Sequence, residues 1–212
     1  MIGARATGLG RLGGGVVASA VLLCALPAQG DLAALPQPVV DALTQIDAAP
    51  SQAALNDMFA SPQAALDNLR ALAVDQTRDL GILGIQLRAI RALPAYCPDA
   101  MQPCGGTPVH DTLLSLIDAY EGSPHAPQDV LRLRAAVEAL GATHSGLVTD
   151  VNKLLPLLDD PSRDVRATVV RALRNTCNAQ AITPLSMHYQ DEPTDQVKLA
   201  IYAALRDLRQ CN

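Results

Sequence analysis

The feature that most constrains the fold of this 212-residue chain is an internal repeat with a period of 32 residues near its C-terminus. Residues 159–177 and 191–211 share an acidic residue followed by proline, then Val-Arg or Val-Lys, then Ala-Leu-Arg. A unit of this length cannot bury an apolar face by itself, so neighbouring copies must stack against one another. The repeat therefore predicts a solenoid.

Each copy predicts a helix with a defined start. Asp160-Pro161 and Glu192-Pro193 place an acidic residue at the N-cap and proline at the first helical position, where its missing N–H costs nothing. Apolar residues then follow at helical spacing on one face. A shorter helix is predicted before each of these, over 151–158 and over 181–189. Each repeat is thus an A helix, a tight acidic turn and a B helix.

Two earlier copies are more degenerate. In the first, an A helix starts at Ser61-Pro62 and a B helix covers about 78–93. In the second, the A helix covers 112–120, and the B helix follows Pro127 and ends at Gly141, which suits a C-cap. The leucines that mark the ends of the four B helices are Leu93, Leu140, Leu173 and Leu205. Their spacings of 47, 33 and 32 place an insertion between the first two repeats.

Helices predicted over 38–47 and 51–59 form an N-terminal cap over the first pair. The composition agrees, because hydrophobic residues make up 49% of the chain and aromatic residues only 2%, which suits closely packed helices better than sheets. We therefore predict an all-α fold, an α-solenoid or α-α superhelix of about four helix pairs. The predicted organisation is a signal peptide over 1–30, the helical cap over 31–60 and the repeat domain over 61–212.

The N-terminus has the pattern of a signal peptide. Arg5 and Arg11 form a positive region, an apolar stretch covers 16–26, and Ala28-Gln29-Gly30 predicts cleavage before Asp31. The mature protein would then be periplasmic or secreted, and no later run is apolar and long enough to form a transmembrane segment. An alternative is a lipoprotein anchored through Cys24, although Leu23 is larger than the residue usual before a lipidated cysteine.

Four cysteines follow this leader, which allows three pairings. Cys97 and Cys104 flank a short loop rich in proline and glycine and predict a local disulfide, which leaves Cys177 and Cys211 to pair with each other. A zinc site is the weaker alternative, because the 97–104 spacing is too wide for a Cys-x-x-Cys motif and no histidine lies at ligand spacing.

The net charge of −5 argues against nucleic acid as a partner, because the phosphate backbone dominates that affinity. The two arginines before residue 31 are not balanced by any acidic residue there, so the mature chain would be more acidic still.

The repeat residues resemble the HEAT repeat family, in the short form named after phycobilisome lyases. The resemblance rests on Asp160-Pro161, Val165-Arg166, Ala172-Leu173 and the A-helix opening over 181–185. It is good over 148–208 and weaker over 61–140. It implies a solenoid whose B helices line the concave side, and it implies protein binding more often than catalysis.

Enzymes of this superfamily with a di-iron centre carry His-Glu dipeptides, and this chain has none. His110, His125, His144 and His188 are expected to be solvated loop residues. Motifs for a serine nucleophile, a phosphate loop or a zinc protease are also absent, and we interpret Asp159-Asp160 as a helix cap. We therefore predict no catalytic residues, no metal ligands and no cofactor.

Equivalent positions of the B helices form columns across the predicted stack. One column is Gln86, Leu133, Arg166 and Lys198, and the next is Ile90, Val137, Val170 and Tyr202. Arg174 and Arg206 extend these columns in the last two repeats. We predict partner-binding residues at Arg166, Arg174, Lys198, Tyr202 and Arg206. A structural role is the alternative for Arg166 and Lys198, with Arg166 paired to Asp164 or Asp191.

These observations predict an exported scaffold or adaptor that binds a protein partner with an acidic contact surface. A metal- or cofactor-dependent enzyme of the same superfamily is one alternative, and a lipid-anchored subunit of an envelope complex is another.

Overall fold

A computed structural model describes residues 37–44, 50–75, 82–98, 104–122 and 126–211. Within these ranges the chain forms α-helices and short 3-10 helices. The α-helices are α1 (Gln37–Thr44), α2 (Gln52–Met58), α3 (Pro62–Ala73), α4 (Leu83–Ala92), α5 (Pro108–Tyr120), α6 (Pro127–Ala142), α7 (Val148–Leu154), α8 (Arg163–Asn175), α9 (Ile182–Asp191) and α10 (Asp195–Leu208). The 3-10 helices are η2 (Leu93–Tyr96), η3 (Leu155–Asp159) and η4 (Ala179–Ala181).

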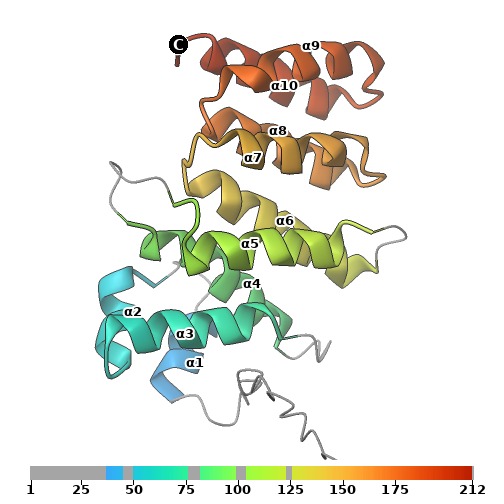
Figure 1. Cartoon of the computed structure of the whole chain (residues 1–212). Coiled ribbons are helices and arrows are strands. Elements are labelled where there is room, and N and C mark those ends of the chain that lie inside the picture. Colours follow the sequence, from blue (N-terminus) through green and yellow to red (C-terminus); the bar gives the residue numbers. More distant parts are fainter. Residues whose placement is uncertain (1–36, 45–49, 76–81, 99–103, 123–125, 212) are drawn as a thin grey trace, which may run out of the picture.

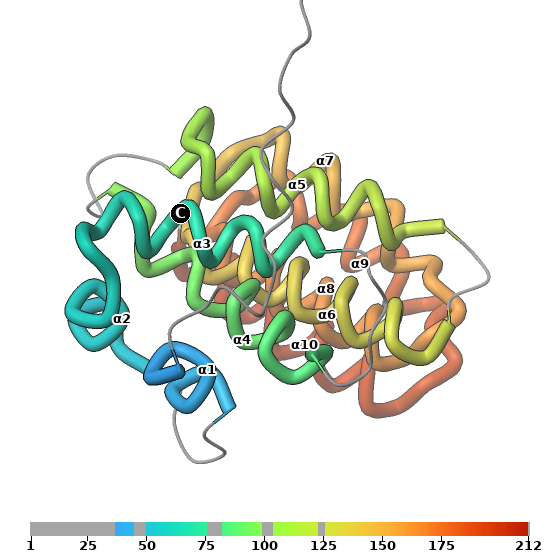
Figure 2. Tube along the Cα trace, turned by 90° about the horizontal axis from the view of Figure 1, so that it is seen from below, coloured from blue at the N-terminus to red at the C-terminus, as the bar shows by residue number. Residues whose placement is uncertain are grey.

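The helices stack as pairs in two layers. The A helices α3, α5, α7 and α9 form one layer, and the B helices α4, α6, α8 and α10 form the other (Figures 1 and 2). Each B helix packs on the B helix of the next repeat, from α4 through α6 and α8 to α10. The predicted all-α solenoid of four helix pairs is confirmed.

The two N-terminal helices lie against the first pair. Helix α1 packs on α4 and helix α2 packs on α3, and Val39, Leu43 and Leu55 are fully buried there. The second of these helices agrees with the prediction, with Ser51 as its N-cap. The first is predicted to reach residue 47, and its last three residues lie outside the described part of the chain.

The starts of the last two B helices differ from the prediction. Helix α8 begins at Arg163 after Ser162, and α10 begins at Asp195 after Thr194, so both start two residues later than expected. The predicted N-cap role of Asp160 is wrong. Its carboxylate accepts a hydrogen bond from the Ser162 backbone N–H at 2.7 Å, and thereby shapes the turn before the helix.

Gly141 is not the predicted C-cap, because α6 continues to Ala142 and its C-cap is Thr143. A side chain at Gly141 would place its Cβ 2.7 Å from Ala172 Cα in α8. The glycine therefore allows α6 and α8 to approach each other closely. His144, at φ 46°, adopts the left-handed conformation that follows the helix end.

Both predicted disulfides are present. Cys97 and Cys104 join the two ends of the insertion between the first repeats, with a Cα–Cα distance of 5.1 Å. Cys177 and Cys211 join the ends of α8 and α10, with a Cα–Cα distance of 5.5 Å. The predicted signal peptide and Cys24 lie outside the described residues, and no helix that the structure describes is long and apolar enough to cross a bilayer.

Candidate functional site

The predicted columns of B-helix residues do not form a surface over most of the stack. Ile90, Val137 and Val170 are fully buried, and Gln86 and Leu133 are almost inaccessible. These positions face the neighbouring repeat, which covers them. In these two columns, only the residues of the last repeat are accessible to solvent: Lys198 is half-buried and Tyr202 is exposed.

Arg166 belongs to the structural framework. Its side chain is buried and forms a two-armed ion pair with Glu192, through Nε to Oε2 at 2.9 Å and Nη2 to Oε1 at 2.8 Å. It also donates to the Asp160 carbonyl at 2.8 Å. The predicted pairing of Arg166 with Asp164 or Asp191 is wrong, because its partner is Glu192 in the turn before α10. Arg166 is therefore a structural residue and not a surface contact.

The Glu192 carboxylate is shaped by the same contacts. The hydrogen bonds from Arg166 lower the pKa of Glu192 to about 2, against the opposing effect of burial. The Thr194 backbone N–H and the His188 ring also hydrogen-bond this carboxylate, at 2.9 Å and 3.1 Å. The carboxylate is thus charged at neutral pH and connects α8, α9 and the start of α10.

The other predicted binding residues separate into two places. Tyr202 and Arg206 are exposed on the outer face of α10, and Lys198 flanks them with its Nζ 6.0 Å from the centre of the Tyr189 ring. Arg174 lies on α8, within 3.8 Å of Asp207 in α10. The structure does not bring all five predicted residues together.

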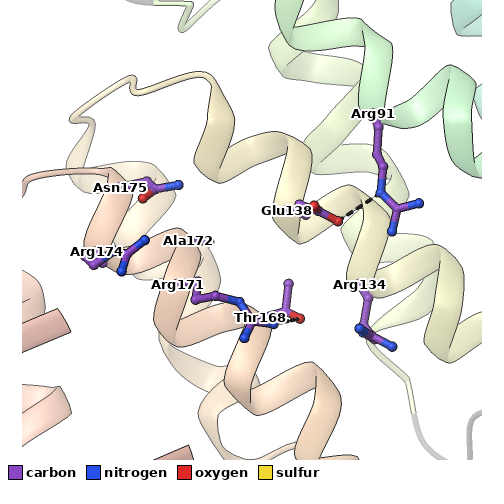
Figure 3. Close-up of a pocket in the computed structure, with 8 residues that line it drawn as sticks. All are labelled: Arg91, Arg134, Glu138, Thr168, Arg171, Ala172, Arg174 and Asn175. Carbon is purple, nitrogen blue, oxygen red and sulfur yellow. Dashed lines mark hydrogen bonds and ion pairs between the residues drawn. The ribbon is translucent and has the colours of Figure 1, made fainter. Parts of the chain in front are cut away.

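A hollow on the B-helix layer collects a different set of cations. It has a volume of about 320 Å³ and spans α4, α6 and α8 (Figure 3). We call it the arginine groove, and its charged lining residues are Arg91, Arg134, Glu138, Arg171 and Arg174. Thr168, Ala172 and Asn175 complete the lining.

The arginine groove is cationic although the whole chain is acidic, because four arginines face one glutamate. Glu138 accepts a hydrogen bond from Arg91 at 2.9 Å, and Arg134 lies 3.6 Å from Asp164. Arg171 donates to the neutral hydroxyl of Thr168 at 3.1 Å. The buried Nε of Arg134 has no hydrogen-bond partner among the described residues. The groove therefore has unused donors and excess positive charge.

Arg91, Arg134 and Arg171 are not among the residues predicted from the sequence. A signal was present, because Arg91, Glu138 and Arg171 each precede the leucine that ends their B helix by two residues. This column lies on the open side of the helices, whereas the predicted columns lie between them. Spacing alone does not tell which face of a stacked helix remains exposed.

The histidines also depart in part from the prediction. His110 is buried and its Nε2 lies 2.7 Å from Asp150 Oδ1, and Ser145 donates to the other carboxylate oxygen. The solvated-loop interpretation is wrong for His110 and for His188, which lies in α9 and bonds Glu192, and it holds for His144, which is exposed. His125 lies outside the described residues.

The serine, histidine and aspartate do not form a nucleophilic triad, because the serine contacts the aspartate and not the imidazole that would have to take its proton. This cluster joins α5 to the start of α7. Across the described ranges, no group of three or more His, Cys, Asp or Glu side chains is placed to hold a metal ion.

Comparison with known proteins identifies the repeat. Residues 113–206 match the family model of HEAT repeats, which covers the chain from within α5 to near the end of α10. No curated protein and no solved structure matches the chain. The matched segment contains three of the four stacked helix pairs and most of the arginine groove. Residues 113–206 of this chain therefore match HEAT repeats.

Proposed function

We propose that this protein is an exported scaffold whose arginine groove holds an acidic segment of a partner protein. HEAT repeats are generally protein-binding scaffolds. The observation that carries the proposal is the set of four arginines from three successive B helices on a chain of net charge −5. We further propose that its role is binding and not catalysis, and that its repeats are of the short, phycobilisome-lyase type, as their spacing of 32 and 33 residues suggests.

The chemistry of the groove favours carboxylates. A guanidinium offers a planar fork of donors that matches a carboxylate, and it is more weakly hydrated than an ammonium group. The arginines follow one another along the stack over α4, α6 and α8. An extended peptide with several aspartate or glutamate residues fits this distribution better than a single small anion would.

Export is supported by two features of the chain. The residues before Asp31 have the charge and hydropathy of a signal peptide, and disulfides such as Cys177–Cys211 persist in oxidising compartments. N-terminal sequencing and intact mass of the protein from its native source test this. A mature chain that starts at Asp31 supports export by cleavage, whereas a lipid on Cys24 would identify an anchored subunit instead.

The binding proposal is tested with a fluorescent peptide rich in aspartate and glutamate, whose anisotropy is followed as the full chain is added. The test variant combines Arg91→Glu with Arg171→Glu. The control combines Arg163→Glu with Arg209→Glu, which makes the same change of net charge at exposed sites outside the groove.

We expect the groove variant to weaken binding about tenfold or more, and the control to stay within about twofold. Added salt should weaken the wild-type complex, because the contacts are solvent-accessible ion pairs. Equal losses in both variants would show only a response to net charge and would contradict the groove. Stoichiometric metal in the purified protein would favour the enzyme alternative.

A further inference from the structure

The outer face of α10 carries a regular stripe of four exposed residues, Asp195, Leu199, Tyr202 and Arg206. Their spacing of 4, 3 and 4 residues keeps them on one side of the helix. The opposite side holds the buried residues of α10, Val197, Ile201, Ala204 and Leu208. Leu199 and Tyr202 are 71% and 64% exposed, which makes them two of the most exposed large apolar side chains of the described chain.

In the preceding repeats the same register positions contact the next B helix. In α6 the equivalents of Leu199, Tyr202 and Arg206 are Arg134, Val137 and Gly141. Arg134 lies beside Asp164 of α8, Val137 is fully buried, and Gly141 faces Ala172 of α8. The stripe is therefore a helix-packing surface by its place in the repeat.

The next pair of helices shows the same relation. In α8 the equivalents are Ala167, Val170 and Arg174, of which the first two are buried and the third lies 3.8 Å from Asp207 of α10. Helices α9 and α10 form the last layer of the stack, and no described helix lies on the far side of α10 (Figure 1). The stripe thus has the position of an inter-repeat surface, and no helix among the described residues covers it.

The order of residues along the stripe points to a second copy of this chain. It runs acidic, Leu, Tyr, basic. When two such helices lie antiparallel, Asp195 of one copy stands opposite Arg206 of the other, and Leu199 stands opposite Tyr202. A two-fold axis generates this arrangement and repeats each pair twice. Apolar contacts then occupy the centre and ion pairs the two ends, as in protein interfaces generally.

The charges also select this register. With Asp195 opposite Arg206, Lys198 lies opposite Ala203 of the other copy. A register centred on Tyr202 would instead place Lys198 opposite Arg206, two cations that repel each other. No ion pair joins the exposed Asp195 carboxylate to another described residue, whereas Arg206 contacts the neighbouring Asp207 at 2.9 Å through a side chain that is 64% exposed. We propose that this protein forms a two-fold dimer through antiparallel packing of α10 on α10.

Analytical ultracentrifugation of the full chain over a wide range of concentration tests the dimer, with light scattering to give the mass. We expect a species of twice 22.2 kDa that dissociates on dilution. Arg206→Asp alone places two aspartates opposite each other at both ends, and Asp195→Arg alone places two arginines there. Each should weaken the dimer about tenfold or more, equivalent to roughly 1.4 kcal/mol.

The decisive variant combines Asp195→Arg with Arg206→Asp, which restores both ion pairs with their charges exchanged. We expect it to dimerise within about threefold of the wild type. Thermal melting of each variant checks that the helix remains folded. The arginine-groove variant should dimerise normally, so that a failure of peptide binding and a failure of dimerisation are separate results.

A mass of one chain at every concentration would overturn the proposal. So would a dimer that neither single reversal weakens, or a double variant as weak as the single ones, because both results would place the contact elsewhere.

Discussion

Arg166 and Glu192 form a buried, two-armed ion pair that joins α8 to the turn before α10, with N–O distances of 2.9 and 2.8 Å. The two residues are 26 positions apart in the sequence, and the pair bridges two consecutive repeats. Because the arginine also donates to the Asp160 carbonyl and to Thr194, it connects the acidic turns that precede both B helices. The Val-Arg element of the repeat is thus a structural link between neighbouring units.

Removing one member of this pair should destabilise the fold strongly. Glu192→Ala leaves a buried guanidinium without its carboxylate, which typically costs about 3–5 kcal/mol. Chemical denaturation, followed by the helical circular dichroism signal, measures the loss. Glu138→Ala is the matched control, since Glu138 is exposed and its pair with Arg91 lies at the surface, where a change of about 0.5 kcal/mol is expected. Equal losses in the two variants would contradict the structural role of the buried pair.

The same carboxylate predicts an acid sensitivity. Its pKa falls from 4.5 to about 2 on folding, mainly because Arg166 hydrogen-bonds the charged form. As the pH falls, Glu192 is protonated in the unfolded chain before it is protonated in the folded protein. The contribution of Glu192 to stability is therefore complete above about pH 4.5 and is lost as the pH falls towards 2. The contribution is on the order of 3 kcal/mol.

Denaturation of the wild type and of Glu192→Gln at pH 6 and at pH 3 measures this effect. The stability difference between the two proteins should shrink at the lower pH. A difference that stays constant would show that Glu192 does not carry the acid response.

Much of the fold could be predicted from the sequence because the repeat fixes both the helix order and the stacking. The pairing of Cys177 with Cys211 follows from the same register, since both cysteines end B helices one repeat apart. The site could not be predicted equally well. A column of equivalent positions was visible, but whether it faces solvent or the next repeat depends on how the helices are rotated about their axes.

Arg132 shows a second limit of sequence patterns. Its register position is that of Val165 in the next repeat, where the pattern expects an apolar core residue. The structure buries the arginine almost completely and bonds it to Gln86 at 2.7 Å and Asp129 at 3.0 Å, with Tyr120 beside it. This buried cation depends on Gln86 of the preceding repeat as well as on Tyr120 and Asp129 of its own, and the repeat pattern does not reveal these partners.

Gly141→Ala should destabilise the protein although alanine is the better helix former. The added Cβ would lie 2.7 Å from Ala172 Cα, so α6 and α8 would have to separate. Such overpacking typically costs about 1–3 kcal/mol. Gly84→Ala is the control, because a methyl group added at Gly84 in α4 would meet nothing within 4 Å, and a gain of up to about 1 kcal/mol is expected there. We expect Gly141→Ala to lower the melting temperature and Gly84→Ala to raise it. A higher melting temperature for Gly141→Ala would contradict the close approach of the two helices.

The buried contact between His110 and Asp150 predicts energetic coupling between α5 and α7. His110→Ala leaves the buried Asp150 carboxylate with fewer hydrogen bonds, at a cost of about 1–3 kcal/mol. Asp150→Asn should cost a similar amount. The double variant should lose less than the sum of the two, and a double-mutant cycle by chemical denaturation measures the difference. Strict additivity would show that the two side chains do not stabilise each other.

The disulfide at the end of the stack should protect the last repeat. Among the described helices, α10 has a neighbouring B helix on one side only, and the Cys177–Cys211 bond ties its end to α8. This bond closes a loop with a sequence separation of 34, which stabilises by about 3–4 kcal/mol when chain entropy dominates. Replacing both cysteines by serine should therefore lower the melting temperature and speed amide hydrogen exchange in α10 before the other helices.

The matched control replaces Cys97 and Cys104, whose sequence separation is 7, so that the loss of stability should be smaller and α10 should keep its protection from exchange. Faster exchange spread evenly over all helices would contradict a local role for the terminal disulfide.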